Sequence, residues 1–206
     1  MFFRQCHAVR AASKILPAFI ILAGYCLPFT QLSAAELVHL ALDQNQGVYQ
    51  LRLEIILDAS PENVHKVVTD YVHIYRINPS IIDSEVLDAP DDSVIRVRTV
   101  INDCIMIFCK ELHRVEEVRE LESGDIYSLV VPELSNVKSG LTIWQIHPMG
   151  KRTRLIYILS LEPDFFVPPL IGTLVVKQKL KKEVLSSLDN IERIAQVHDS
   201  NIETSE

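Results

Sequence analysis

The sequence has few of the residues and spacings that mark common catalytic and cofactor sites. Its six glycines are scattered over 206 residues, so there is no glycine-rich loop to hold a phosphate group. The histidines show no HExxH or paired ligand spacing, and no cysteine pattern of a zinc site occurs. Internal repeats and low-complexity segments are also lacking. We therefore expect no metal and no bound cofactor.

A basic segment followed by an apolar run is typical of a secretory signal peptide. Arg4, Arg10 and Lys14 precede an uncharged run over 15–29, which is short for a membrane-spanning helix. Small residues follow and end at Ala35. We expect residues 1–35 to be cleaved and the chain to be exported, to the periplasm if the host is a Gram-negative bacterium. An uncleaved signal anchor is the alternative.

The rest of the chain has an excess of acidic residues. The full sequence has 20 Lys and Arg residues against 27 Asp and Glu residues, and loss of the three basic signal residues leaves 17 against the same 27. A phosphate-binding surface needs a basic face, so nucleic acid is not expected as a partner. Residues 36–195 are enough for one domain with a buried core, and the polar segment 196–206 is expected to be a frayed tail.

Hydrophobic periodicity predicts one strand, two short helices, six strands and one long helix, in that order. Val48–Asp58 alternates as a half-buried strand, and Ser60 and Pro61 suit the N-cap and first position of a helix. A second helical piece is expected at 73–80. The six further strands are expected at 81–89, 93–101, 109–121, 125–134, 139–148 and 153–163. Short turn segments between them favour an antiparallel meander.

The long helix is expected from Pro168 onward. Its apolar stripe recurs every three or four residues, at Leu180, Val184, Leu188, Ile191 and Ala195. The twelve residues of Phe165–Val176 carry no charge, so the first turns are apolar all round. This end either fills a deeper core or forms a cavity entrance or a patch that docks on lipid. The lysines that follow would suit anionic head groups: Lys177, Lys179, Lys181 and Lys182.

This order of elements, with the segments ASPENVHKVVTDYVHIYRINPSIIDSEVL (59–87) and FFVPPLIGTLVVKQKLKKEVLSSLDNIERIA (165–195), resembles the START-like polyketide cyclase/dehydrase and lipid-transport superfamily. The resemblance implies an α+β helix-grip fold, in which a curved antiparallel sheet of about seven strands wraps around the long C-terminal helix. It also implies a cavity between the sheet and that helix, which often holds a hydrophobic ligand.

Two cysteines, Cys104 and Cys109, remain after the signal segment, and an oxidising compartment would favour a disulfide between them. On one straight strand their Cα atoms would lie about 16 Å apart, so a bond needs a turn between them. The residues IMIF would then form a four-residue hairpin loop with an apolar tip. In the alternative, Asn102 and Asp103 make the turn and both thiols are buried.

The first hypothesis for function is binding or transport of a hydrophobic small molecule or lipid, with no catalytic residue. The candidate ligand-binding residues are large and apolar or aromatic: Tyr75, Phe108, Trp144, Phe165, Phe166, Leu170 and Leu174. Trp144 also fits a purely structural place in the core.

The second hypothesis is a cyclase or dehydratase. Members of the superfamily with such activity use polar groups inside the cavity, and the candidates here are Tyr75, Arg76, Arg96 and Arg98. Arg96 and Arg98 share the polar face of a strand and should point to solvent, which weakens this reading. An envelope module that binds a protein partner is the third hypothesis, and a solid core without a cavity would favour it.

Overall fold

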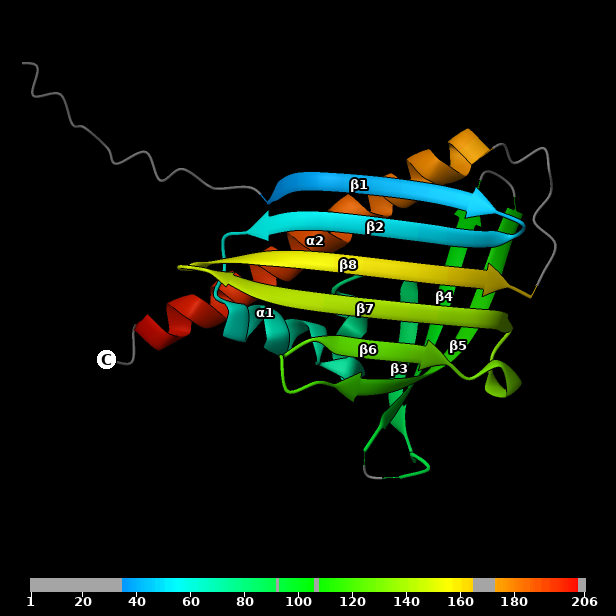
Figure 1. The fold of residues 1–206 in the computed structure, drawn as a ribbon, viewed down its shortest axis with the longest axis horizontal. Helices are drawn as coiled ribbons and strands as arrows, with labels where there is room; N and C mark the ends of the chain where they lie inside the picture. The colour runs from blue at the N-terminus through cyan, green and yellow to red at the C-terminus, as the bar shows by residue number, and fades with distance from the viewer. Residues whose placement is uncertain (1–34, 92, 106–107, 165–172, 204–206) are drawn as a thin grey trace, which may run out of the picture. The chain divides into compact units, whose positions relative to one another are not determined.

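Eight antiparallel strands form one sheet with the order β1-β2-β8-β7-β6-β5-β4-β3 (Figure 1). The structure, a computed structural model, describes residues 35–91, 93–105, 108–164 and 173–203. The elements are β1 (Glu36–Asn45), β2 (Val48–Leu57), α1 (Pro61–Val68), the 3₁₀ helix η1 (Tyr71–Arg76), β3 (Ile81–Leu87), β4 (Ile95–Ile105), β5 (Phe108–Glu120), β6 (Ile126–Val130), the 3₁₀ turn η2 (Pro132–Leu134), β7 (Val137–Met149), β8 (Arg152–Pro163) and α2 (Thr173–Glu203).

The architecture is the α+β helix-grip fold expected from the resemblance, with one strand more than the seven predicted. The additional strand is β1, which pairs with β2 across a two-residue turn at Gln46 and Gly47. Both turn residues have positive φ angles, 50° and 89°, as a tight hairpin turn requires. The strand lies at one edge of the sheet and buries neither face fully, so its sequence lacks a strong pattern of alternation.

Local sequence signals explain how α1 begins. Ser60 has extended backbone angles and its side chain accepts a hydrogen bond from the Asn63 backbone N–H at 3.4 Å, while Pro61 occupies the first helical position. Val64, Val67 and Val68 form the buried face of the helix. The second helical piece, η1, starts two residues earlier than predicted, at Tyr71, and is a 3₁₀ helix.

The long helix α2 packs its apolar stripe on the inner face of the sheet and runs behind β1, β2 and β8 in Figure 1. Leu188, Ile191 and Ala195 are buried in the same core cluster as Leu53 and Ile55 of β2. The helix continues to Glu203, through most of the segment for which a frayed tail was predicted. No described helix is both long and apolar enough to cross a membrane.

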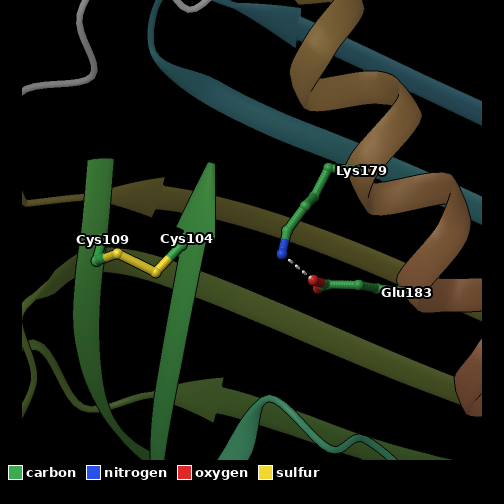
Figure 2. Close-up of a disulfide and its surroundings, with 4 residues drawn as sticks. All are labelled: Cys104, Cys109, Lys179 and Glu183. Carbon is green, nitrogen blue, oxygen red and sulfur yellow. Dashed lines mark ion pairs between the residues drawn. A yellow bond between two sulfur atoms is a disulfide. The ribbon is translucent and has the colours of Figure 1, made fainter. Parts of the chain in front are cut away.

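Strands β4 and β5 form a hairpin that the two cysteines bridge. Cys104 lies directly opposite Cys109, with an S–S distance of 2.03 Å and a Cα–Cα distance of 3.9 Å (Figure 2). Pairing continues beyond the bond to Ile105 and Phe108, so the four-residue loop predicted for IMIF is wrong. A turn at Asn102 and Asp103 is also wrong, because both residues lie within β4.

Candidate functional site

A cavity lies between the inner face of the sheet and the α1–η1 segment. Strands β4 to β8 supply one wall, and Val68, Tyr71 and Ile74 supply the other. The described lining residues from the sheet are Val97, Thr99, Arg114, Glu116, Val118, Ile126, Ser128, Thr142, Trp144 and Tyr157. Five of these thirteen lining side chains are apolar aliphatic groups, and the others include one acid, one base and several hydroxyl groups. The cavity is therefore chemically mixed.

The cavity is small in this structure, about 50 Å³. One water molecule needs roughly 10–15 Å³ on the same measure, so the space would suit a few waters or one small polar group. Pockets that bury a drug-sized ligand typically measure about 300–1,000 Å³. A whole lipid would enter only if the wall formed by α1 and η1, or another part of the lining, moved outward.

A buried carboxylate organises the polar side of the cavity. Glu116 on β5 accepts a hydrogen bond from the Ser128 hydroxyl at 2.9 Å and a longer one from the Thr142 hydroxyl at 3.4 Å, both at Oε1. Its other oxygen, Oε2, lies 3.0 Å from Nε of Arg114. The three partners come from β5, β6 and β7, so the sheet itself positions the cluster.

Tyr157 extends this cluster to β8. Burial raises the pKa of its hydroxyl to about 12; the Arg114 charge and the neighbouring Thr142 hydroxyl oppose this effect, and the Glu116 charge reinforces it. The Tyr157 ring packs on Trp144, with ring centroids 4.4 Å apart.

Arg114 is the cationic partner of this cluster. Only 13% of its side chain is exposed, against 9% for Glu116. Its Nε atom is buried and forms no aligned hydrogen bond, although it lies in ion-pair distance of Glu116. The N–H could turn toward an acceptor placed in the cavity. Among the described residues, no group of His, Cys, Asp and Glu side chains is arranged to hold a metal ion.

The predicted ligand-binding residues have different places in the structure. Trp144 lines the cavity, and it also packs against the core. Tyr75 is 44% exposed on η1 and is not among the lining residues. Phe108 is the first residue of β5, and Leu174 lies in the first turn of α2, but the structure does not describe these two side chains. Phe165, Phe166 and Leu170 lie outside the described residues.

The candidate arginines of the enzyme hypothesis lie away from the cavity. Arg96 pairs with Glu117 at 2.6 Å, and Arg98 pairs with Asp83 at 2.7 Å on the outer face of the sheet. Arg76 lies 3.9 Å from Asp70 on η1 and is more than half exposed. The polar groups that do converge on the cavity are others, Arg114 and Glu116 among them, and the sequence analysis missed them.

Sheet, helices and cavity together define the class of the protein, a START-like ligand-binding or polyketide cyclase domain. The family model described as polyketide cyclase / dehydrase and lipid transport matches residues 49–196, so the chain belongs to this family. No curated protein sequence matches the chain at a significant level.

Solved structures of low sequence identity share the fold. An aromatase/cyclase from Streptomyces sp. R1128 is 12% identical with a TM-score of 0.58, and the match covers 72% of this chain and 94% of that one. A STAR-related lipid transfer protein fragment from Xanthomonas axonopodis is 18% identical with a TM-score of 0.54, over 75% and 98% of the two chains. Human StAR-related lipid transfer protein 5 is 14% identical with a TM-score of 0.57, over 79% and 88%.

Proposed function

We propose that this protein is an exported domain that binds a hydrophobic small molecule or lipid in the cavity between the sheet and the helices. The observation that supports it is the cavity itself, which has an apolar side and a buried polar end in a family that includes lipid-transport proteins. A ligand with an apolar body and one polar group fits both parts. Burial of the body contributes roughly 25 cal/mol per Å².

The two sides of the cavity have different tasks in this proposal. Val68, Ile74 and Val97 contact the apolar body, and Trp144 offers an aromatic face. The polar group of the ligand meets the Glu116 cluster. Because the space is about 50 Å³, binding of a larger molecule is coupled to an outward movement of the lining. We expect the ligand-bound protein to be measurably wider around η1 than the structure described above.

The test is mass spectrometry of an organic extract from gently purified protein. A stoichiometric amphipathic species is expected. Ile74→Trp on η1 places a large ring at the cavity wall and should abolish that signal, while Val72→Trp, on the exposed side of the same 3₁₀ helix, should leave it unchanged. Thermal unfolding of both variants checks that they fold. No species in the wild-type extract, together with no binding of added fatty acids or sterols, would contradict the proposal.

An enzyme of the cyclase or dehydratase type is the second candidate. It is favoured by the Tyr157 hydroxyl, which lines the cavity beside Thr142 and Glu116 and whose pKa is raised by burial, because a protonated phenol can donate to the carbonyl oxygen of a bound substrate and polarise it. If this candidate is correct, Tyr157→Phe retains ligand in the extract but loses turnover of an added polyketide-type substrate. If the protein only binds, the wild type shows no turnover either.

Export by cleavage after Ala35 is part of the proposal. Sequencing the N-terminus of protein from the extracytoplasmic fraction should find Glu36 first, and any other N-terminus would contradict the expected site.

Contact with a membrane surface is proposed through the lysines at the start of α2. Lys181 and Lys182 are exposed, whereas Lys179 is engaged with Glu183 at 2.8 Å (Figure 2). Vesicles with and without anionic lipid would distinguish charge-dependent binding.

A further inference from the structure

The two edges of the sheet differ in how they are protected from pairing with another strand. An unpaired edge strand exposes N–H and C=O groups that can bind a further strand, and proteins usually block it with charges, bulges or covering elements. β3 forms one edge and β1 forms the other. Only one of them has the usual protection.

The β3 edge is short, charged and covered. Its seven residues include Asp83 and Glu85, both held in ion pairs by Arg98 of β4. A bulge interrupts its register between Ile81 and Asp83. The 3₁₀ helix η1 packs on it, and the Ser84 hydroxyl donates a hydrogen bond to the Tyr71 carbonyl oxygen. These features disfavour addition of a strand at β3.

The β1 edge is longer and less protected. Its ten residues contain no proline, lysine or arginine, and its one bulge lies near the start, between Leu37 and His39. Among the described strands it pairs only with β2. From His39 to Asn45 the strand is regular, and exposed residues predominate along it. It therefore offers a regular stretch of backbone for pairing.

The hairpin turn determines which residues of β1 have free backbone groups. Asn45 lies opposite Val48 across the two-residue turn, and such a flanking pair exchanges both of its backbone hydrogen bonds. Alternate residues along the strand then bond to β2 in the same way. The N–H and C=O groups of the remaining residues, Leu40, Leu42 and Gln44, point to the free edge.

We propose that β1 pairs antiparallel with β1 of a second copy of this chain, with the two-fold axis at Ala41. In this register Leu40 forms a hydrogen-bonded pair with the second copy's Leu42, and both residues belong to the set with free backbone groups. The two sheets then become one continuous sheet.

Charge complementarity selects this register over its neighbours. With the axis at Ala41, His39 lies opposite Asp43 of the second copy, and the symmetry repeats this pair on the other side. His39, Ala41 and Asp43 face outward, because they lie opposite Glu54, Arg52 and Gln50 on the outer face of β2. Moving the axis by one residue to Leu40 or to Leu42 separates the His–Asp pairs.

The dimer is expected to be weak and dependent on concentration. About four main-chain hydrogen bonds form around the axis, with the outer-face polar pairs and the Leu40–Leu42 contacts beside them. An interface of this kind is smaller than the roughly 1,200 Å² of stable complexes, so exchange with monomer is fast.

Analytical ultracentrifugation of the full chain over a range of concentrations tests the proposal. Ala41→Lys places two lysines against each other at the axis and should weaken dimerisation at least ten-fold. Ser160→Lys on β8, which adds the same charge to the same outer face but two strands away from β1, should leave it unchanged. A monomer at every concentration up to about 1 mM would overturn the proposal. So would a dimer that Ala41→Lys leaves intact.

A charge exchange tests the register. His39→Asp should weaken the dimer, because it sets two carboxylates opposite each other twice. The double variant His39→Asp with Asp43→His should restore it. Failure of the double variant to restore a dimer that His39→Asp has lost would overturn the register centred on Ala41. Circular dichroism of each variant confirms that the fold is retained.

Discussion

Arg114 and Glu116 hold opposite charges inside the cavity, where 13% and 9% of their side chains are exposed. The two hydroxyl groups that donate to Glu116 help to offset the cost of removing the carboxylate from water. Removing one member of such a pair leaves the other charge buried without compensation. Breaking the pair should therefore cost more stability than the attraction between the two charges alone would suggest.

The first prediction concerns this carboxylate. Glu116→Gln should lower the free energy of unfolding by about 3–5 kcal/mol, because Arg114 is left without its counter-ion. Glu117→Gln, one residue away on the outer face, removes a more exposed pair with Arg96, whose side chains are 30% and 21% exposed, and should cost at most about 1 kcal/mol. Urea denaturation of the two variants measures both values. Equal costs would contradict the buried role of Glu116.

Glu192 on α2 is a second buried acid, with the opposite pH consequence. Burial, together with the charge of Asp58, raises its pKa. The folded chain therefore holds this proton more tightly than the unfolded chain does. Stability falls as pH rises from the unfolded value, about 4.3, through the raised folded pKa, and the loss is complete above it. One oxygen of this carboxylate, Oε2, has no hydrogen-bond partner.

The second prediction follows from this sign. Glu192→Gln should raise the free energy of unfolding at pH 7 by about 1 kcal/mol, since it removes a buried charge with an unpartnered oxygen. The gain should disappear below about pH 4, where the wild-type acid is protonated in both states. Glu122→Gln, in the exposed turn between β5 and β6, should show no gain at either pH. Urea denaturation of both variants and the wild type at the two pH values measures these differences. An equal gain at both pH values would contradict the prediction.

Single residues of the site were difficult to predict because β5 has charged residues on both faces. Arg114 and Glu116 alternate with His113 and Glu117, so no apolar stripe shows which set points inward. The register with β4 carries that information. Pairing Cys104 with Cys109 places Arg114 opposite Thr99 and Glu116 opposite Val97, and the apolar alternation of β4 shows that those two residues face the core.

At the scale of elements, the end of the β4–β5 hairpin extends beyond the residues that pair with the neighbouring strands β3 and β6. The disulfide links the two strands near this end. The bond closes a loop of only a few residues, so it removes little entropy from the unfolded chain. By the loop-closure relation the stabilisation is about 2 kcal/mol. The exposed position of both cysteines makes the bond accessible to reductant.

The third prediction is that this bond is present in protein purified without reductant. Peptides containing Cys104 and Cys109 should resist alkylation until a reductant is added. Reduction should lower the free energy of unfolding by about 2 kcal/mol, and the double variant Cys104→Ala with Cys109→Ala should be insensitive to reductant. Thiols that alkylate without reduction would refute the bond.

Gly140 on β7 marks a close approach of two strands. A Cβ atom at this position would overlap Cγ2 of Val130 and lie 3.2 Å from Cδ1 of Leu161. Val130 is β-branched and has little freedom to turn away. The absence of a side chain at Gly140 therefore lets β7 pass beside the end of β6.

The fourth prediction is that Gly140→Ala lowers the free energy of unfolding by about 1–3 kcal/mol through overpacking. Val130→Ala in the same chain should recover part of this loss, because it removes the atom that would be overlapped. The double variant should thus be more stable than the sum of the single changes indicates. Additive losses in thermal or urea unfolding would show that Val130 is not the obstacle.

Most strands and helices could be predicted from the sequence, and β1 is the exception. β2 and α1 have one buried face each, and this gives their sequences a clear hydrophobic period. β1 is held by backbone pairing with β2 and has little buried surface, so only the Gln46-Gly47 turn signals it. Backbone pairing leaves no trace in side-chain hydrophobicity.

At the scale of the whole molecule, α2 closes the core by side-chain burial and by hydrogen bonds at both ends of the packed stretch. The Asn190 side chain donates to the Ile77 carbonyl oxygen at 3.1 Å, and Gln196 donates to that of Asp58 at 3.0 Å. Ile191, between them, is fully buried.

The fifth prediction concerns this closure. Ile191→Ala should lower the free energy of unfolding by about 2–5 kcal/mol, because it leaves a cavity between α2 and the sheet. Val197→Ala, at an exposed position on the same helix, should change it by less than about 0.5 kcal/mol. Similar effects of both substitutions on the urea midpoint would contradict the packing of α2.

The pairing of β2 with β8 has a consequence for the order of events in folding. Arg154 of β8 bonds to Glu54 of β2 across 100 residues of chain. Closing a loop of that length is slow, and contacts of long sequence separation delay folding. During synthesis the first hairpin emerges long before its partner strand exists. The apolar face of β2 therefore remains uncovered until nearly the whole chain has left the ribosome. We expect a chaperone that binds unfolded chains to bind this exposed face.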